Sequence, residues 1–246
     1  MWNFSGKTFL VTGANSGIGK QLTLKLVTLG ARLFIIDKNQ DQMVLVHNEF
    51  PHLVTHYVLD LTDIDGISQF MNSLRVKNVK LDGLVHCAGI SPLMTLADFD
   101  FNLSLITYKI NLFSFMAFSR FFMDERFTNE DSSIVGISSS TSVYGGNRQY
   151  IYSSTKSAMN LFVKSTAKEL ATRKIRINAV LPSITNTEMV AKLRTESDAI
   201  DMNVKYKQPL GIVQPDDVCN AILFLLSEQS NAISGTLMKV NNGESY

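Results

Sequence analysis

The feature that most constrains the fold is a regular alternation of strand-like and helix-like segments along the 246 residues. Short runs of β-branched and aliphatic residues are separated by segments with a helical period. Strands that alternate with helices are joined by crossovers, which makes neighbouring strands parallel and covers both faces of the sheet. The sequence therefore predicts an α/β fold, a doubly wound parallel sheet with helices on both faces. The expected strands are 8–11, 32–36, 56–59, 81–86, 133–137, 176–180 and 236–240, and the expected helices are 20–27, 40–49, 64–76, 102–122, 152–172 and 215–227.

The composition indicates one domain, 1–246, and argues against several classes of protein. There are five prolines, and no linker rich in glycine, serine or proline divides the chain. Lys and Arg (23) nearly balance Asp and Glu (22), so no overall field favours nucleic acid. The start lacks the pattern of a signal peptide, and the apolar runs are too short to span a membrane. Two cysteines and four histidines show no metal-binding spacing. We therefore expect a cytoplasmic protein without a metal site.

A glycine-rich turn follows the first expected strand, at the edge where ligands of an open parallel sheet bind. Its sequence, TGANSGIG at 12–19, leads into a helix. Glycines let the backbone approach a pyrophosphate, whose charge is met by free N–H groups at the helix start. Such turns also occur by chance, but this one opens a βαβ unit and so predicts a dinucleotide site. The expected cofactor contacts are Gly13, Asn15, Ser16, Gly17, Ile18 and Gly19.

An acidic residue, Asp37, ends the second expected strand. A carboxylate at this point accepts hydrogen bonds from ribose hydroxyls and repels a 2′-phosphate, which favours NAD(H) as cofactor. The neighbouring Lys38 is a cation that could pair with the 2′-phosphate, which would allow NADP(H) as an alternative cofactor.

Further cofactor contacts are expected after the third and fourth strands. Asp60, with Leu61 beside it, either accepts a bond from the adenine amino group or serves as a helix cap or turn residue. Small residues after the fourth strand would let the backbone pass under the adenosine ribose, and they are Cys87, Ala88 and Gly89.

Tyr152 and Lys156 lie four residues apart at the start of an expected helix, so both side chains share one face. A tyrosine is a weak acid and base at neutral pH, and a nearby cation stabilises its phenolate. Ser139 is expected to stand at the carboxyl end of the preceding strand, where its hydroxyl would hold a substrate oxygen beside the tyrosine. Asn111 interrupts an apolar helix and is expected either to hold a water that carries protons to Lys156 or to satisfy a neighbouring backbone group.

Taken in order, these segments resemble the short-chain dehydrogenase/reductase family. The chain contains TGxxxGxG, an aspartate after the second strand, CAG where the family has NAG, an asparagine, ISS, YxxxK, and Pro-Ser where Pro-Gly is usual. The match covers essentially the whole chain and is most similar to the 3-oxoacyl-carrier-protein reductase group. It implies a Rossmann-type fold and an enzyme that transfers a hydride between NAD(P)(H) and a carbonyl or secondary alcohol. The tetrad that it implies is Asn111, Ser139, Tyr152 and Lys156.

The resemblance also assigns roles to these side chains. Tyr152 would be the general acid/base, and Ser139 would polarise the carbonyl. Lys156 would bind the nicotinamide ribose and lower the pKa of Tyr152, with Asn111 keeping a relay water. Pro182 and Thr187 are further implied cofactor contacts, the latter at the nicotinamide carboxamide.

Three departures from the family pattern leave the tetrad intact. Cys87 replaces an asparagine, so a hydrogen bond at the centre of the sheet is expected to be missing or rerouted. Ser183 stands where glycine is common, and Val-Asn-Asn-Gly at 240–243 replaces Val-Asp-Gly-Gly. Buried cysteine is more often an inert small hydrophobe than a nucleophile, and we expect this of Cys87.

The sequence leaves three functional hypotheses: an enzyme with either of two substrate classes, or a protein without catalytic activity. A 3-oxoacyl thioester agrees with the resemblance, and a sugar or other polyol intermediate is the alternative. Substrate choice is expected to lie in segments 91–97, 140–150 and 187–206. A catalytically silent dinucleotide sensor or scaffold is the third hypothesis, and the intact tetrad argues against it.

The aromatic segment 102–122 is apolar on more than one face. Core packing accounts for part of this pattern, and a subunit interface would account for the rest. In related enzymes this helix and the helix with YxxxK form a four-helix contact. We therefore expect a homo-oligomer, either a tetramer or a dimer.

Overall fold

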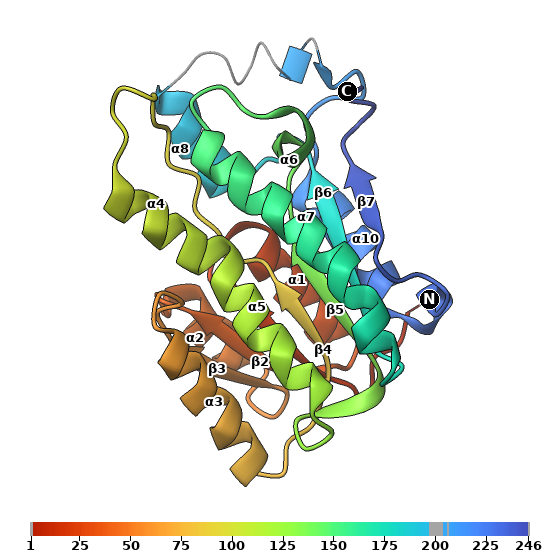
Figure 1. Cartoon of the computed structure of the whole chain (residues 1–246). Helices are drawn as coiled ribbons and strands as arrows, with labels where there is room; N and C mark the ends of the chain where they lie inside the picture. The colour runs from red at the N-terminus through yellow and green to blue at the C-terminus, as the bar shows by residue number, and fades with distance from the viewer. Residues whose placement is uncertain (1, 197–203, 206, 246) are drawn as a thin grey trace.

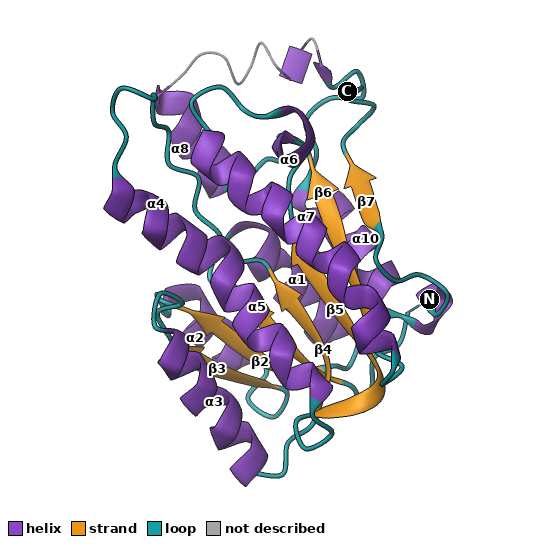
Figure 2. Ribbon diagram, in the orientation of Figure 1, coloured by secondary structure: helices purple, strands orange, loops and turns teal. Residues whose placement is uncertain are grey.

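The computed structural model describes residues 2–196, 204–205 and 207–245, and its centre is a single seven-stranded sheet (Figures 1 and 2). Every strand pairing is parallel, and the strand order is β3-β2-β1-β4-β5-β6-β7. This order starts a crossover on each side of β1, which is the doubly wound arrangement that the sequence predicts. The strands are β1 (Thr8–Thr12), β2 (Arg32–Asp37), β3 (Val54–Val58), β4 (Leu81–His86), β5 (Thr128–Ile137), β6 (Arg176–Pro182) and β7 (Leu237–Val240).

Helices cover both faces of the sheet (Figure 2). One face carries α1 (Gly17–Thr28), α2 (Asp41–Glu49) and α10 (Pro215–Leu226). The opposite face carries α3 (Ile64–Val76), α4 (Phe101–Tyr108), α5 (Ser114–Ser119) and α7 (Tyr150–Ala171). Two short helices, α6 (Thr141–Tyr144) and α8 (Glu188–Glu196), lie beyond the carboxyl ends of β5 and β6.

Two hydrophobic cores follow from the alternation of side chains along the strands. In β1, Leu10 faces the core beneath α3, α5 and α7, while Val11 faces the core beneath α1 and α10. In β4, Leu84 and Val85 divide between the same two cores. Each central strand is apolar on both faces because helices cover both, and this is the continuous apolar pattern that the sequence shows.

The predicted boundaries hold to within a few residues, with two larger differences. The third strand begins at Val54, where its backbone joins the ladder opposite Leu33. The fifth strand begins at Thr128, because an irregularity in register allows a pairing with Leu81 before the apolar run starts. The first residues of β5 are mostly polar, and a run of apolar residues therefore predicts only the later part of this strand.

The segment predicted as one helix, 102–122, divides into four pieces. Between α4 and α5 lies a π-helical turn, η1 (Lys109–Phe113), and a 3₁₀ turn, η2 (Arg120–Met123), follows α5. The Ile110 carbonyl accepts from Ser114 Oγ at 2.7 Å and lies 3.2 Å from His86 Nε2, so side chains replace regular helical bonding at this point. Most of its phenylalanines belong to the core, since Phe115 and Phe118 are fully buried and only Phe113 in this stretch is largely exposed.

None of the described helices combines the length and the apolar character that a membrane-crossing helix needs.

Candidate active site

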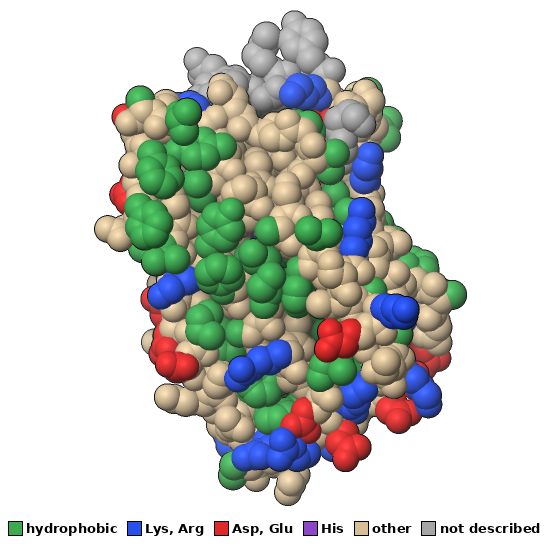
Figure 3. Space-filling view, viewed as in Figure 1, with side chains coloured by type: hydrophobic (Ala, Val, Ile, Leu, Met, Phe, Trp, Pro, Cys, Tyr) green, Lys and Arg blue, Asp and Glu red, His purple; other side chains and the backbone are tan. Residues whose placement is uncertain are grey.

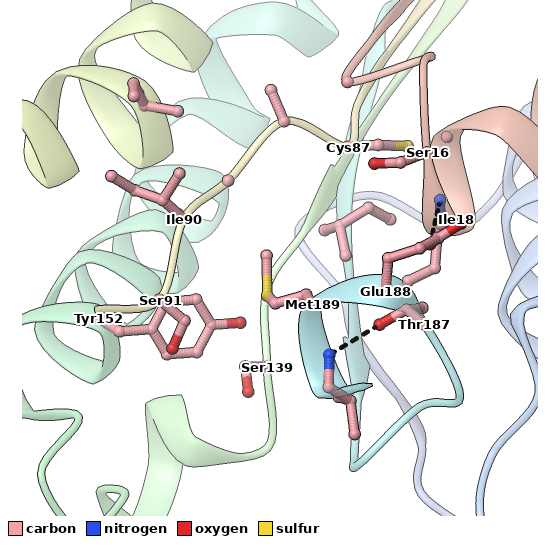
Figure 4. Close-up of a pocket in the computed structure, with 18 of the residues that line it drawn as sticks. Ser16, Ile18, Cys87, Ile90, Ser91, Ser139, Tyr152, Thr187, Glu188 and Met189 are labelled. Atoms are coloured by element: carbon pink, nitrogen blue, oxygen red, sulfur yellow. Dashed lines mark hydrogen bonds between the residues drawn. The ribbon is translucent and has the colours of Figure 1, made fainter. Parts of the chain in front are cut away.

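A cavity of about 670 Å³ opens at the carboxyl edge of the sheet, between the turns after β1, β2, β3, β4, β5 and β6 (Figure 4). Its size suits a dinucleotide together with a small substrate. Most of the residues predicted from the sequence line it. They are Gly13, Asn15, Ser16, Gly17, Ile18, Gly19, Asp37, Asp60, Leu61, Cys87, Ala88, Gly89, Ser139, Tyr152, Lys156, Pro182 and Thr187.

The glycine turn brings two strand ends into direct backbone contact. Gly13 has φ +68°, and a Cβ on it would lie 2.6 Å from the Ala88 backbone nitrogen. A Cβ on Gly19 would lie 2.1 Å from the Gly13 carbonyl oxygen. Both positions therefore require glycine, one for its conformation and both for space. The close approach leaves the start of α1 open to the cavity.

Asp37 lies at the same end of the cavity as the glycine turn, and its carboxylate is oriented by two hydrogen bonds. It accepts from the backbone N–H groups of Asn15 at 3.2 Å and of Asn39 at 3.1 Å. The Asn15 side chain in turn accepts from the backbone of Gln42 at 2.8 Å, at the start of α2. The sequence identified Asn15 as a cofactor contact, and the structure adds that it connects the glycine turn to α2.

Asp60 has the local role that was one of its two predicted alternatives. Its Oδ1 accepts from the Thr62 backbone N–H at 2.8 Å, which stabilises the turn after β3. This hydrogen bond lowers the pKa of Asp60. The cap of α3 is instead Asp63, whose side chain accepts from the Gly66 backbone at 2.9 Å. Asp60 nevertheless remains on the cavity wall.

A buried histidine next to Cys87 makes a hydrogen-bonded connection at the centre of the sheet. His86 Nδ1 lies 2.8 Å from Thr12 Oγ1, and its Nε2 lies 3.2 Å from the Ile110 carbonyl oxygen. Because a carbonyl only accepts, Nε2 carries the proton, and Nδ1 accepts from the Thr12 hydroxyl. Thr12 Oγ1 also accepts from the Ala88 backbone at 3.4 Å. The His86 side chain therefore connects β1, β4 and the π turn through hydrogen bonds.

The pKa shifts of His86 and Cys87 agree with structural roles for both side chains. Burial lowers the pKa of His86 to about 3, so the ring is neutral at physiological pH. Burial raises the pKa of the Cys87 thiol far above its usual range, which makes it a poor nucleophile, as expected from the sequence. Among the described residues, no cluster of three or more His, Cys, Asp or Glu side chains is placed to hold a metal ion.

Tyr152 and Ser139 come from different elements and meet at one wall of the cavity (Figure 4). Tyr152 belongs to the first turn of α7, and Ser139 is the second residue after β5. Ser139 Oγ lies 3.0 Å from Thr141 Oγ1 and accepts from the Thr141 backbone at 3.2 Å, which orients it. Burial raises the pKa of Tyr152, and a hydrogen bond from Ser139 opposes that rise.

Lys156 is 3% exposed, and its ammonium is held by backbone. Nζ donates to the Ile137 carbonyl at 2.6 Å and lies 5.7 Å from the centre of the Tyr152 ring. Burial lowers the pKa of Lys156 to about 8. In the protein alone, therefore, Lys156 is not a cause of the Tyr152 pKa shift, which burial dominates.

Asn111 lies in the π turn and is fully buried, with its amide bonded to protein groups. Its Oδ1 accepts from the Ile90 backbone N–H at 2.9 Å, and its Nδ2 donates to the Ile90 carbonyl at 3.0 Å. Nδ2 also donates to Thr155 Oγ1 at 3.0 Å. Of the two predicted alternatives for this side chain, the structure shows the satisfaction of backbone groups. Asn111 holds the segment after β4 against α7 beneath the cavity floor.

Sequence reasoning missed the acidic residue next to Thr187. Glu188 begins α8, and its Oε2 accepts from the Gly17 backbone N–H at 3.0 Å (Figure 4). A carboxylate thus occupies part of the anion-binding helix start that the glycine turn creates. This contact shows that the turn accepts an anion, and it supports the fit of a cofactor pyrophosphate. The Thr187 hydroxyl accepts from the Val190 backbone at 3.4 Å and so caps α8.

The fold and the cavity together define a dinucleotide-dependent oxidoreductase, and comparison with known proteins agrees. A family model described as enoyl-(acyl carrier protein) reductase matches residues 13–245. The chain is 32% identical over 245 residues to the 3-oxoacyl-[acyl-carrier-protein] reductase FabG of Thermotoga maritima, with 97% of each chain covered. The chain belongs to the short-chain dehydrogenase/reductase family and is an NAD(P)-dependent oxidoreductase.

Solved structures with sugar-related descriptions are also similar. A short-chain dehydrogenase/reductase of Brucella melitensis, described as glucose/ribitol dehydrogenase, superposes with a TM-score of 0.91 at 25% identity, covering 100% of this chain and 99% of that one. A structure from Beutenbergia cavernae, described as a candidate NAD(P)-dependent gluconate 5-dehydrogenase with bound NADP at low occupancy, gives a TM-score of 0.89 at 25% identity, covering 98% and 97%. The family is therefore established, while the relatives divide between two substrate classes.

The position of Glu188 predicts that this side chain weakens cofactor binding. Its negative charge lies at the helix start where a pyrophosphate would bind, and like charges repel. We expect Glu188→Gln to lower the Kd for NADH about three- to tenfold in low salt, with a smaller gain in high salt because the site is exposed. Isothermal titration calorimetry at two ionic strengths measures the effect, with exposed Glu49→Gln as the control. Weaker binding by Glu188→Gln would show that the carboxylate supports the turn instead.

Proposed function

We propose that this enzyme transfers a hydride between NAD(P)(H) and a carbonyl or secondary alcohol, with Tyr152 as general acid/base and a 3-oxoacyl thioester as substrate. The observation that carries the proposal is that Tyr152 and Ser139 line the same cavity, and that a hydrogen bond from Ser139 acts on the Tyr152 hydroxyl. The nicotinamide, when bound, supplies or accepts the hydride at the substrate carbon. The protein's part is to hold the substrate oxygen and to move its proton.

Proton transfer in the reductive direction follows from these two hydroxyls. Ser139 Oγ donates a hydrogen bond to the carbonyl oxygen and fixes its position. Tyr152 Oη gives its proton to the same oxygen as the alcohol forms. Because burial raises the pKa of Tyr152, the protein alone keeps the tyrosine in its acid form, which suits reduction. In the oxidative direction the phenolate must form first, and a nearby positive charge is needed to stabilise it.

Lys156 contributes to this chemistry by binding the cofactor. Its ammonium is anchored by the Ile137 carbonyl and faces the cavity beside Gly89, so it is placed to donate to ribose hydroxyls. An ammonium costs free energy to bury. A protein that only bound a dinucleotide or served as a scaffold has no evident use for this buried cation next to a half-buried tyrosine. The pair therefore favours an enzyme over the silent sensor that the sequence left as an alternative.

The substrate class rests on the relatives and on the cavity wall. The relative from Thermotoga maritima is named for 3-oxoacyl-[acyl-carrier-protein] reduction, which supports a thioester substrate. Hydroxyl-bearing lining residues favour a sugar or polyol as the second candidate, as do the sugar-related structures, and these residues include Ser91, Ser138 and Ser183. Of the predicted substrate segment 187–206, residues 197–203 and 206 lie outside the described residues.

The role of Tyr152 is tested by removing its hydroxyl alone. Tyr152→Phe deletes the proton donor, and general acid/base groups supply about 100- to 10,000-fold in rate. We expect turnover of acetoacetyl-coenzyme A to fall by that factor while the Kd for NADH stays within about twofold. Tyr57→Phe is the matched control, because that hydroxyl accepts from Lys77 Nζ at 3.4 Å and does not line the cavity. A loss below tenfold in Tyr152→Phe would overturn the assignment.

NAD(H) is the proposed cofactor, because the Asp37 carboxylate faces the adenosine end of the cavity. A 2′-phosphate beside it would lose roughly 1–3 kcal/mol, which is about 5- to 150-fold in affinity. We expect kcat/KM to favour NADH, and Asp37→Ala to shift the preference toward NADPH. Adding Lys38→Ala should reverse part of that shift, whereas exposed Asp41→Ala should change nothing. A tenfold preference of the wild type for NADPH would refute the proposal.

A homo-oligomer is proposed from the exposed apolar surface over α4, α5 and α7, which Figure 3 shows as a band of hydrophobic side chains. Phe101 is 68% exposed and Leu161 is 66% exposed, which is unusual for such large apolar groups. Phe118 is fully buried, so a charge there would probe the core and not the surface. We expect the wild type to be a tetramer or dimer in light scattering and Leu161→Glu to be a smaller species. Leu210→Glu, at another exposed leucine, is the control and should keep the mass of the wild type. A monomeric wild type at micromolar concentration would contradict the proposal.

A further inference from the structure

A buried carboxylate near the C-terminus joins two of the departures from the family pattern. Glu244 follows the altered segment 240–243 and is 5% exposed, and Ser183 stands where glycine is common. The Ser183 hydroxyl donates to Glu244 Oε2 at 2.6 Å. A glycine at 183 would have no hydroxyl to donate. The serine and the glutamate therefore act as a pair, although 61 positions separate them.

The second oxygen of the same carboxylate receives a hydroxyl from the segment after β5. Tyr144 Oη donates to Glu244 Oε1 at 3.0 Å. Ser140 Oγ lies 3.2 Å from Tyr144 Oη. A phenol has one proton, and Tyr144 gives it to the carboxylate, so Ser140 is the donor in the second bond. We call Ser140, Tyr144, Ser183 and Glu244 the C-terminal clasp.

The backbone after β7 is shaped to hold Glu244 in this place. Asn242 and Gly243 have φ of +49° and +83°, which turns the chain back toward the sheet edge. Glu244 N–H donates to the Asn241 carbonyl at 3.0 Å, and Asn241 Nδ2 donates to the Glu244 carbonyl at 2.6 Å. A buried carboxylate is stable only when its oxygens are hydrogen-bonded, and this one has a hydroxyl on each oxygen.

We propose that Glu244 is a positioning residue for the reaction, an inference that rests on the proposed function. The clasp ties the segment after β5, where Ser140 adjoins Ser139, to the segment after β6, where Ser183 lines the cavity. The Ser140 backbone also donates to the Pro182 carbonyl at 2.9 Å, so the two segments share a backbone contact. The clasp fixes the Ser139 hydroxyl relative to the opposite wall and thereby sets the substrate geometry.

The location of the clasp predicts an effect on the substrate and none on the cofactor. Ser139 and Ser183 belong to the catalytic end of the cavity, whereas Asp37 and the glycine turn form its other end. Small displacements of a positioning group cost up to about 100-fold in rate. We expect Glu244→Gln to lower kcat/KM for the carbonyl substrate about 10- to 100-fold, with the Kd for NADH within twofold of the wild type.

The kinetic test compares Glu244→Gln with Glu228→Gln, an exposed glutamate that serves as the control. Ser183→Ala and Tyr144→Phe should each lower kcat/KM, and the double variant Ser183→Ala with Glu244→Gln should lose little more than either single one, because the residues act as a unit. A full-rate Glu244→Gln enzyme would overturn the proposal. A parallel fall in melting temperature, NADH affinity and turnover would also overturn it, because that pattern marks a merely structural residue.

Hydrogen exchange separates this proposal from the proposed function. The amides of Ser142, Val143 and Gly145 donate to carbonyls within the clasped segment, at 3.1, 3.0 and 2.9 Å. Glu244→Gln should speed their exchange in the NADH complex, and unchanged exchange would overturn the clasp whatever the substrate. If turnover proves indifferent to Tyr152→Phe, the proposed function fails and takes the positioning role with it, while faster exchange would still establish the clasp.

Discussion

The buried hydrogen-bond chain from Thr12 through His86 to Ile110 is the interaction on which the rest of the site depends. It joins the end of β1, where the glycine turn begins, to the π turn that carries Asn111. A buried polar chain is stable only when every member is satisfied, so the three groups hold one arrangement. The neutral ring of His86 supplies one donor and one acceptor, which is what a hydroxyl on one side and a carbonyl on the other require. The end of the cavity at the glycine turn and the segment before the π turn are thereby held in a fixed relation.

The groups proposed for catalysis are held mainly by backbone carbonyl and N–H groups. Lys156 is anchored by the Ile137 carbonyl at the end of β5, and Asn111 is bonded to both backbone groups of Ile90. Strand ends leave such groups without ladder partners, so the carboxyl edge of the sheet has donors and acceptors available. The same edge therefore favours ligand binding and the orientation of catalytic side chains. This accounts for the convergence of residues from six strands, β1 to β6, on one cavity.

Departures from the family pattern prove to be connected when the structure is considered. The loss of an asparagine at Cys87 is accompanied by the histidine before it, which makes the connection across the sheet centre. The serine at 183 is accompanied by Glu244, 61 positions later. In the second case, the hydroxyl that serine adds at position 183 has a buried acceptor nearby in space. Unsatisfied buried polar groups cost free energy, which gives a physical reason for such pairs.

The sequence alone determined the doubly wound sheet, the glycine turn, Asp37, and the placing of Tyr152, Ser139 and Lys156 at strand and helix ends. These features depend on local periodicity and on motifs of a few residues, which a linear reading contains. The sequence did not reveal the π turn at Asn111, the bond from Glu188 to the glycine turn, the connection through His86, or the pairing of Ser183 with Glu244. Each of these depends on groups from segments that are distant in sequence. Only the tertiary structure decides them, because a hydrogen bond is set by distance and direction in space, and the crossovers of the sheet determine which strand ends become neighbours.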